Sequence, residues 1–415
     1  MRKRLSLTPA APAILAFAAL SALAFLAAAC GAGGDASAEQ WTALQEWSTY
    51  QGNAAHTGYV PVTLDPGVFA ERFNILVGGG IELNPVIPSG ELVFLSEKGW
   101  FEPQKLYSVR VLSGTKVWEH DFGPINSLDP PAYFDGKVYM GTSGHEDTFL
   151  YIFDARTGEM RARTSFRNQW SLYYSPVIDG GVVYMGGGYN GGMYAFSAGD
   201  GQQLWFVELN QYDLWTPAVD SLYAYAYTGE YDPKVSVINR ENGAVVYEIP
   251  DANFVWDGWS MNQAPVLGSQ TNLLAVNGGR LISFDLARRA VGWEIPESFK
   301  GQLTLAEGVI YVVNGGRVDA RDEADGRFLW SWTPPASSPQ LTIQKPLLAT
   351  KNLLFVGCES EYIWGERAVG KTYAVDLKTH VTQWTYDWAG HMAIGKRGNL
   401  FISTRDGQLV AIRVK

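Results

Sequence analysis

The histidines are the residues best suited to acid–base or metal chemistry, but their spacing favours neither. The chain has His56, His120, His145, His380 and His391. A zinc site on a helix needs two histidines about one turn apart, and no two of these are that close in sequence. We therefore interpret them as structural or solvated side chains.

Two other segments resemble cofactor-binding motifs only superficially. Residues 322–325 (DEAD) precede Gly326, but the alternating ligands and the distal glutamate of a calcium loop are missing. The GGGYNGG run at Gly186–Gly192 lacks the lysine and the following helix of a phosphate-binding loop. With 42 acidic residues in the chain, pairs of carboxylates are expected by chance. The sequence thus predicts no catalytic residue, no metal site and no cofactor, and we expect a protein that is not an enzyme.

The elements that would position any site are short strands and tight turns. The chain is 47% apolar and 18% charged, which is enough for a substantial core and excludes global disorder. Its 45 glycines and 15 tryptophans fit strands and turns better than long helices. The formal net charge of −10 argues against nucleic acid as a partner, because phosphate binding needs clustered lysines and arginines.

The N-terminal segment is a targeting sequence. Residues 1–29 combine a basic start with an apolar run that ends at Cys30, and this junction resembles a bacterial lipoprotein signal. We expect residues 1–29 to be a signal peptide and residues 30–45 a flexible linker, lipid-anchored through acylated (palmitate-bearing) Cys30. An uncleaved membrane anchor, or a cysteine there by chance, is the alternative. Cys358 lies in an apolar run and is expected to be a small buried residue.

A hairpin with a turn residue and an aromatic residue four places later recurs along the chain. The clearest copy is Met193–Trp205, MYAFSAGDGQQLW. The turn and aromatic positions are Gly114/Trp118, Gly158/Ala162, Gly201/Trp205, Gly243/Tyr247, Arg289/Trp293, Gly326/Trp330 and His380/Trp384. An eighth copy begins at Leu409, and the chain ends before its turn.

A second signal precedes each of the eight hairpins and gives the same count. It is a pair of short apolar strands around a polar or glycine turn, as in YSPVIDGGVVYMG at residues 174–186. Each unit therefore has four strands, A to D, which predicts an all-β, eight-bladed β-propeller over residues 46–415. The aromatic residue near the end of strand D would fill the wedge between neighbouring blades. Because the last unit lacks strand D, we expect the N-terminal strand Phe73–Val77 to complete it and close the ring.

These residues resemble the PQQ-like repeat propellers. The closest copies are Pro176–Gly188 with Met193–Trp205, and Thr372–Trp384, while EWSTYQGNAAHTGY at Glu46–Tyr59 is similar to the leader in front of such propellers. Eight blades, no second domain and a lipid anchor are most similar to the BamB-type outer-membrane barrel-assembly lipoproteins, which are non-catalytic scaffolds. The quinoprotein dehydrogenases share the repeat and hold a quinone with calcium above the ring axis. They are generally longer, and the vicinal cysteine pair of the alcohol-oxidising members is absent here, so we do not expect PQQ.

Strand order puts the B–C and D–A loops at one end of the ring and the short A–B and C–D turns at the other. These are termed the loop end and the turn end. Acidic residues such as Glu97 and Glu359 are expected at the loop end, together with most of the out-of-register aromatic residues. The candidate binding residues there are Trp100, Trp170, Trp215, Trp256, Trp259 and Trp364. Exposed aromatics with polar neighbours are typical of recognition surfaces, although rings that pack between blades or fill the central channel are the alternative.

From these features we predict a non-catalytic scaffold that is exported and anchored to the cell envelope. Gly31 after the cysteine favours the outer membrane, with the protein facing the periplasm. The expected partners are envelope proteins, including the barrel-assembly machinery, bound through the loop end. A propeller that binds a carbohydrate or another small ligand on its aromatic loop end is the alternative, and a quinone-dependent dehydrogenase-like protein is the second alternative.

Overall fold

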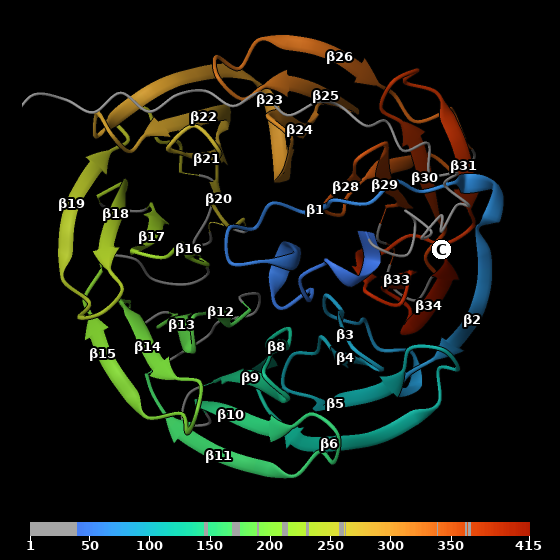
Figure 1. Cartoon of the computed structure of the whole chain (residues 1–415), viewed down its shortest axis with the longest axis horizontal. Coiled ribbons are helices and arrows are strands. Elements are labelled where there is room, and N and C mark those ends of the chain that lie inside the picture. Colours follow the sequence, from blue (N-terminus) through green and yellow to red (C-terminus); the bar gives the residue numbers. More distant parts are fainter. Residues whose placement is uncertain are drawn as a thin grey trace, which may run out of the picture.

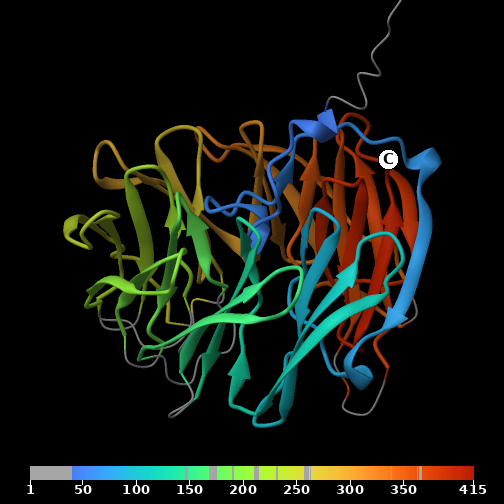
Figure 2. The same cartoon turned by 60° about the horizontal axis from the view of Figure 1, so that its bottom comes forward.

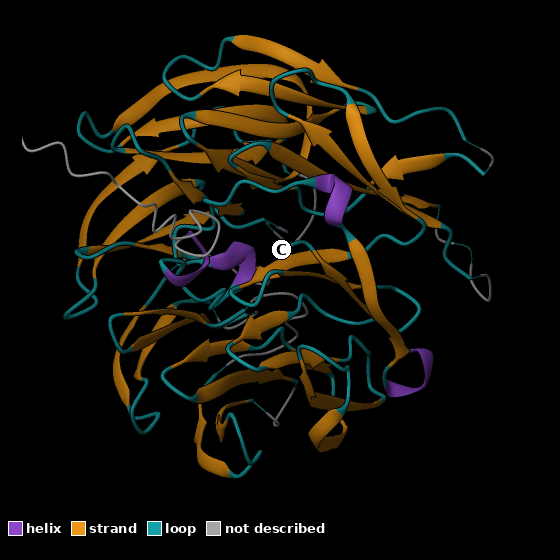
Figure 3. Ribbon diagram, turned by 45° about the vertical axis from the view of Figure 1, so that its right-hand side comes forward, coloured by secondary structure: helices purple, strands orange, loops and turns teal. Residues whose placement is uncertain are grey.

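The computed structural model describes residues 40–144, 148–167, 175–188, 191–209, 215–229, 232–256, 261, 263–337, 339–361, 363 and 367–415. Over these residues the chain consists mainly of short antiparallel strands, arranged as sheets around a central axis (Figures 1 and 2). Three short 3₁₀ turns interrupt them: η1 (Tyr50–Gly52), η2 (Pro66–Val68) and η3 (Gly78–Gly80) (Figure 3). The all-β propeller fold predicted from the repeat is confirmed. No helix within the described residues has the length and hydrophobicity needed to cross a membrane.

The strands of the described residues form seven sheets. The first four contain β3 (Ile87–Ser89), β4 (Leu92–Ser96), β5 (Pro103–Arg110) and β6 (Lys116–Pro124); β7 (Ser127–Leu128), β8 (Ala132–Phe134), β9 (Lys137–Ser143), β10 (Phe149–Asp154) and β11 (Met160–Ser165); β12 (Val177–Asp179), β13 (Val182–Gly186), β14 (Met193–Ser197) and β15 (Gln203–Val207); and β16 (Ala218–Val219), β17 (Tyr223–Thr228), β18 (Lys234–Asn239) and β19 (Val245–Pro250).

The other three sheets are less regular, because two of them include strands from the N-terminal part of the chain. They contain β20 (Val266–Leu267), β21 (Asn272–Asn277), β22 (Gly279–Asp285), β23 (Ala290–Ala306), β24 (Val309–Asn314), β25 (Arg317–Asp322) and β26 (Phe328–Trp332); β1 (Tyr59–Val60), β27 (Leu341–Ile343), β28 (Leu348–Thr350), β29 (Leu353–Ser360), β30 (Gly370–Asp376) and β31 (Thr382–Tyr386); and β2 (Ala70–Leu76), β32 (His391–Gly395), β33 (Asn399–Ser403) and β34 (Gln408–Arg413).

The longest strand, β23, explains an irregular spacing in the repeat. It pairs with β22 through its first part and with β24 through its last, which joins seven strands into one sheet. The distance in sequence between the turn residues Arg289 and Gly326 is short because no loop separates the two units here. The β23–β24 register breaks between Lys300 and Thr304, and Gly301 has a φ of +73° at this bulge. A bulge of this kind bends a strand and re-aims its side chains.

The recurring aromatic residue of strand D packs against the C–D turn of the next unit. Trp205 Nε1 donates a hydrogen bond to the carbonyl oxygen of Arg240 at 2.9 Å. A Cβ atom on the turn residue Gly243 would lie 2.8 Å from the Trp205 ring, so only glycine allows this approach. Trp118 repeats the arrangement, with its Nε1 donating to the carbonyl oxygen of Ala155 at 3.0 Å.

Where the turn residue is not glycine, the contact takes another form. Arg289 has a φ of 57° and its guanidinium lies 4.5 Å from the centre of the Tyr247 ring. His380 has a φ of 60° and stacks on Trp330 with ring centres 4.2 Å apart. The two exceptions in the sequence repeat therefore keep the left-handed backbone of the turn and replace a packing contact by a cation–π or stacking contact.

The sheet that contains β32, β33 and β34 also contains β2 from the other end of the sequence. β2 pairs antiparallel with β34, and Phe73 lies opposite Ala411. A Cβ on Gly114 would lie 3.0 Å from the Phe73 ring. Phe73 thus packs against the C–D turn of the first unit as the strand-D tryptophans pack against the other turns.

The leader, residues 46–60, crosses the inside of the ring and hydrogen-bonds to one unit after another (Figure 1). The backbone N–H groups of Tyr133, Val219, Leu267, Leu305 and Ala349 donate to the carbonyl oxygens of Ser48, Ala54, Ala55, Thr57 and Gly58 at 2.8–3.1 Å. These donors lie in β8, β16, β20, β23 and β28, which belong to five different units. The leader ends in β1, which pairs in parallel with β28.

Side chains before the leader also belong to the core. Trp41 and Leu44 are only 3% and 7% exposed and pack in the cluster that contains Phe73 and Leu409. These two residues fall in the segment that we expected to be a flexible linker, so the packed part of the chain begins before residue 46.

Candidate functional site: a cavity on the ring axis

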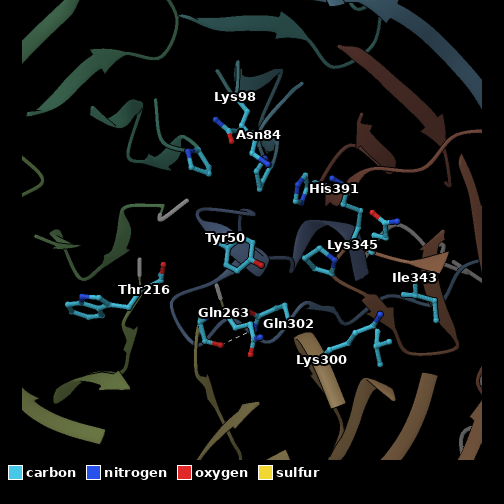
Figure 4. A pocket seen from close by; sticks show the side chains of 18 residues that line it. Tyr50, Asn84, Lys98, Thr216, Gln263, Lys300, Gln302, Ile343, Lys345 and His391 are labelled. Carbon is cyan, nitrogen blue, oxygen red and sulfur yellow. Dashed lines mark hydrogen bonds between the residues drawn. The ribbon is translucent and has the colours of Figure 1, made fainter. Parts of the chain in front are cut away.

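A cavity of about 470 Å³ lies on the axis of the ring. Most of its wall comes from residues within or just before the first strands of different units, and Tyr50 of the leader contributes as well. The labelled side chains, among them Asn84, Lys345 and His391, surround Tyr50 (Figure 4). The ring therefore brings together residues as far apart in the sequence as Tyr50 and His391.

The leader closes the cavity at the turn end. Its hydrogen bonds reach the ends of the first strands that are nearest the A–B turns, as at Val219 in β16. Wall residues such as Thr216, Gln263 and Lys345 instead precede these strands. Among the described residues, the wall thus extends from Tyr50 at the turn end toward the loop end.

His56 fixes the leader to the ring. Its side chain is fully buried, with Nδ1 2.8 Å from the carbonyl oxygen of Tyr50 and Nε2 2.8 Å from that of Pro217. Burial lowers the pKa of His56, although both carbonyl contacts act in the opposite direction. The residue is structural, as the sequence indicated.

Three lysines line the cavity, whereas no carboxylate does so among the described residues. Two of the three are held from behind the wall by Glu82, whose Oε1 lies 3.2 Å from Lys98 Nζ and 3.5 Å from Lys345 Nζ. Lys345 also lies 3.8 Å from Glu359, whose pKa is raised by burial. The third, Lys300, is exposed at the β23 bulge and makes no ion pair within the described part of the chain. In a protein with a net charge of −10, this wall is locally positive.

His391 responds to this positive potential. It lies in β32 and lines the cavity. Burial lowers its pKa well below the ordinary value, and the nearby ammonium groups of Lys345 and Lys98 lower it further. His391 is therefore neutral at neutral pH and offers the cavity one donor or one acceptor.

Several polar atoms of the wall residues are buried and have no hydrogen-bond partner among the described residues. Asn84 is fully buried, and its Nδ2 donates to Ser96 Oγ and to the carbonyl oxygens of Glu97 and Leu128 at 2.9–3.2 Å. These three acceptors identify the donating atom of the side-chain amide as Nδ2. The other amide atom, Oδ1, has no hydrogen-bond partner among the described residues. The same holds for Trp215 Nε1, in a side chain that is 2% exposed, and for Gln263 Oε1. Such atoms usually cost about 1–3 kcal/mol each unless a water or ligand satisfies them.

The tryptophans predicted at the loop end have different environments. Trp100, between β4 and β5, is 49% exposed and packs edge-on against Phe101, with ring centres 5.7 Å apart. Trp256, after β19, is 47% exposed. Trp215 is instead buried in the wall of the cavity, as in the alternative that some rings pack inward. Trp170, Trp259, Trp364 and the lipidation candidate Cys30 lie outside the described residues.

Two of the acidic residues expected beside these tryptophans, Glu97 and Glu359, are buried, whereas Glu102, Asp232 and Glu361 of the same loops are exposed. Glu97 is 2% exposed, and it accepts hydrogen bonds from the Tyr107 hydroxyl at 2.6 Å and the Lys105 backbone N–H at 2.8 Å. Glu359 is 1% exposed. Cys358 is buried as expected, and burial raises the pKa of its thiol to about 12. Glu359 thus lies behind the wall beside Lys345, whereas Glu97 belongs to a separate hollow that Lys105 and Tyr107 also line.

The fold and this axial cavity define a propeller of the PQQ-like repeat class. The family model described as "Outer membrane protein assembly factor BamB" matches residues 103–332, more than half of the chain. The chain therefore belongs to this family.

Solved structures support the same fold. BamB from Moraxella catarrhalis is similar with a TM-score of 0.63 at 14% identity, covering 83% of this chain and 100% of that chain. A europium-containing methanol dehydrogenase is similar with a TM-score of 0.66 at 11% identity, covering 91% of this chain and 99% of that chain. No curated protein matches the sequence. At these identities the structural likeness concerns the fold alone.

The described residues around the axis do not fit the calcium ion of the related dehydrogenases. A calcium ion is held by several carboxylate and carbonyl oxygens. The wall carries three lysines instead, and among the described residues no group of three or more His, Cys, Asp or Glu could hold a metal ion. The ammonium groups would repel a cation placed among them.

Sequence reasoning missed the axial cavity because its residues carry no motif. Asn84, Gln302 and Lys345 differ in type from unit to unit, although each lies near the start of a first strand. One pattern in the sequence could have identified them. Segments such as NPV and KPL recur in the units, and the residue before the proline, Asn84 before Pro85 and Lys345 before Pro346, lines the cavity.

Proposed function

We propose that the protein is a non-catalytic, lipid-anchored scaffold of the cell envelope that binds protein partners at the loop end of its propeller, in outer-membrane protein assembly. Membership of the BamB family supports the assembly role. The observation that carries the binding surface is the group of exposed apolar side chains at the loop end. Trp100 and Phe101 are 49% and 54% exposed, and Val255 and Trp256 are 45% and 47% exposed.

The backbone at Phe101 also favours a binding role for this surface. Phe101 has a φ of 58°, a conformation that costs roughly 1–2 kcal/mol for a residue with a side chain. Its N–H donates to the carbonyl oxygen of Asn126 at 3.2 Å, which holds the loop in this form. Strained residues of this kind are concentrated at functional surfaces.

We also propose that the ring has eight blades and that β2 closes it. The four-stranded units share one strand order, and the seven-stranded sheet divides into two units that share β23. Closure by β2 is supported by its pairing with β34 and by the contact of Phe73 with Gly114. A closed ring leaves no first or last blade edge to aggregate.

The test of the scaffold is co-purification from envelope extract with the anchored full-length protein. We expect barrel-assembly components to co-purify with the unmodified chain and to be lost with Trp100→Ala plus Trp256→Ala. A matched control is Leu112→Ala plus Leu222→Ala, because these side chains are 51% and 62% exposed at the turn end. Equal recovery of partners with both double variants would show that the loop end is not the binding surface.

The membrane anchor is tested separately. We propose that Cys30 carries the lipid and holds the protein at the outer membrane, facing the periplasm. Cys30→Ser should abolish incorporation of labelled palmitate and release the protein from the membrane fraction, since several acyl chains are needed for durable anchoring. Continued membrane association of this variant without palmitate would favour an uncleaved apolar anchor.

A further inference from the structure

We propose that one side of the turn end rests against the anionic headgroups of the bilayer, so that the loop end faces away from the membrane. This inference deepens the proposed lipid anchor at Cys30 and rests on it. The surface is termed the anchor face and consists of exposed side chains around the start of the described chain: Val68, Lys351, Lys378, Val381, Arg413 and Lys415.

The described chain begins at the turn end and is fixed there. Gln40 exchanges two hydrogen bonds with Thr63: its Oε1 accepts from the Thr63 N–H at 2.9 Å, and its Nε2 donates to the Thr63 carbonyl oxygen at 3.3 Å. The ammonium group of Lys415 lies 5.8 Å from the centre of the buried Trp41 ring. The start of the described chain (blue) lies along the upper edge of the ring in Figure 2.

The tether between this point and the proposed lipid is short. Gln40 lies ten positions after Cys30. A flexible chain of that length spans about 18 Å on average and no more than about 35 Å when fully extended. An eight-residue strand such as β5 is itself roughly 26 Å long. A lipid on Cys30 therefore holds the turn end close to the bilayer, whereas the loop end could approach it only with the tether almost fully extended.

The anchor face has four basic side chains that make no ion pair with another described residue. Lys351 lies in the A–B turn between β28 and β29, and Lys378 lies in the C–D turn between β30 and β31. Arg413 ends β34, and Lys415 follows it. All four side chains are exposed. Basic groups in this position are attracted to a bilayer surface that contains anionic lipids.

The carboxylates nearest to the anchor face are engaged in other contacts. Glu46 lies 3.4 Å from Lys396 Nζ, and Glu71 accepts a hydrogen bond from the Tyr386 hydroxyl. Asp65 is exposed and accepts the N–H that caps η2 at 2.9 Å. The four basic side chains are therefore only partly balanced by acidic neighbours.

The other side of the turn end has the opposite character. The C–D turns between β14 and β15 and between β18 and β19 carry the exposed acids Asp200 and Glu241. Arg240, beside Glu241, is paired with Asp179. In a chain with a net charge of −10, the unpaired basic groups are thus concentrated on the side where the chain begins. Charge complementarity therefore favours an anionic surface as the occupant of this side.

Two exposed valines complete the anchor face. Val68 in η2 is 41% exposed, and Val381 before β31 is 55% exposed. Their elements adjoin, because Phe69 packs edge-on against Trp384 of β31 with ring centres 5.3 Å apart. Arg413 Nη2 donates to the carbonyl oxygen of Val68 at 3.5 Å. Apolar side chains beside basic ones suit the membrane interface, where the apolar groups enter the acyl boundary and the charges stay among the headgroups.

The experiment compares the two ends of β2 in the full-length, lipid-bearing protein. It is reconstituted in vesicles of phosphatidylethanolamine and phosphatidylglycerol with nitroxide-labelled headgroups, and a fluorophore is attached at Ala70→Cys or at Leu76→Cys. Both positions are exposed, and they are roughly 20 Å apart along β2, so quenching should be at least about twofold stronger at position 70. Cys358 is buried, and the pKa of its thiol is raised to about 12, so it does not compete for the label.

A double variant tests the basic groups. Lys351→Gln plus Lys378→Gln should reduce the quenching at position 70 by at least about half, because each lysine near an anionic surface raises the population in contact roughly fivefold. The matched control is Arg156→Gln plus Arg288→Gln, at exposed C–D turn residues of other units, and should leave the quenching unchanged. Circular dichroism and thermal melting establish that each variant is folded.

Equal quenching at positions 70 and 76 would overturn the proposal, as would stronger quenching at position 76. Quenching at position 70 that the lysine variant does not reduce would also overturn it. Mass spectrometry of the same sample measures the lipid on Cys30. A protein without that lipid would overturn the anchor and the anchor face together, whereas a lipid-bearing protein with equal quenching would overturn the anchor face alone.

Discussion

Trp205 and Trp215 are both buried, at 8% and 2% exposure, and pack in the same apolar cluster, but their indole N–H groups differ in their hydrogen bonding. Trp205 fills the seam between two units, and its Nε1 donates to the carbonyl oxygen of Arg240. Trp215 is one of the residues that line the axial cavity, and its Nε1 has no hydrogen-bond partner among the described residues. The Trp205 contact is complete in itself, whereas no described residue accepts a hydrogen bond from Trp215 Nε1.

This difference separates residues that build the ring from residues available for binding. Seams repeat around the ring, so their residue types recur and are optimised against one another. The axis is met once by each unit, and each unit supplies a different residue there: Asn84, Thr216, Gln263, Lys345 or His391, for example. The axis is therefore the region where the units differ most in residue type, and differences in binding are expected there rather than in the seams.

The largest effect is expected in the seam. Trp205→Ala removes a buried indole and its hydrogen bond, and large-to-small changes of this kind cost about 3–5 kcal/mol. The free energy of unfolding, measured by urea denaturation, should fall by that amount. Trp256→Ala is the control, because its ring is 47% exposed, and should change stability by less than about 0.5 kcal/mol. Equal losses for the two variants would contradict the wedge role of Trp205.

The next effect is expected where the leader closes the cavity. Gly58 has a φ of +64°, and an added Cβ would lie 2.7 Å from Gln51 Nε2 and from Thr304 Oγ1. Gly58→Ala should therefore cost about 2–3 kcal/mol, combining backbone strain with a clash. Gly136→Ala is the matched control: its φ is +75° with open space around the added Cβ, so it should cost only about 1 kcal/mol. Urea denaturation measures both values. Equal losses of unfolding free energy in Gly58→Ala and Gly136→Ala would show that Gln51 and Thr304 move away from the added methyl group at little cost.

The features that could be predicted from the sequence are those that a local pattern encodes, and contacts between distant residues could not be predicted. The hairpins with Gly201 and Trp205 gave the unit, its four strands and the seam contact, because a local pattern encodes them. The leader was recognised as a segment, but its path was not, since bonds such as Leu305 N–H to Thr57 join residues far apart in the sequence.

The candidate site was predicted less well for a physical reason. Exposure cannot be read from residue type, so Trp100 and Trp215 were assigned to one surface although one is exposed and the other buried. Glu97 and Glu359 were expected beside them for the same reason and are buried. The lysines of the wall could not be predicted as a group, because Lys98, Lys300 and Lys345 are far apart in the sequence and line one cavity only in the folded ring.

A smaller effect is expected from pH, because the leader contains the buried His56 and the cavity wall contains the half-buried His391. The pKa values of His56 and His391 are lowered by burial from 6.5, so the unfolded chain binds more protons as the pH falls. Their contribution to stability is complete above pH 6.5 and is lost below it, by up to about 1.4 kcal/mol per histidine for each pH unit. Burial raises the pKa of Asp129, which acts in the opposite direction over the same range.

A variant isolates the histidine contribution from that of the acidic residues. The difference in unfolding free energy between the unmodified chain and His391→Gln, measured from pH 7.5 to 5, should shift in favour of the variant as the pH falls. Asp129 is present in both proteins, so its contribution cancels. A difference that stays constant with pH would show that His391 is not held neutral in the folded state.

The last pair of variants compares the two tryptophans directly, because the same substitution is made at each, and the smallest expected effect is that of Trp215→Phe. Trp205→Phe should cost about 1–3 kcal/mol, since it leaves the Arg240 carbonyl oxygen without its donor and reduces packing against Gly243. Trp215→Phe removes a donor that has no partner, so its loss of packing should be offset and stability in the absence of ligand should change by less than about 1 kcal/mol. Urea denaturation of both variants in plain buffer measures the two values. A loss for Trp215→Phe as large as that for Trp205→Phe would mean that the cavity tryptophan is a structural wedge, and the distinction between seam and cavity would fail.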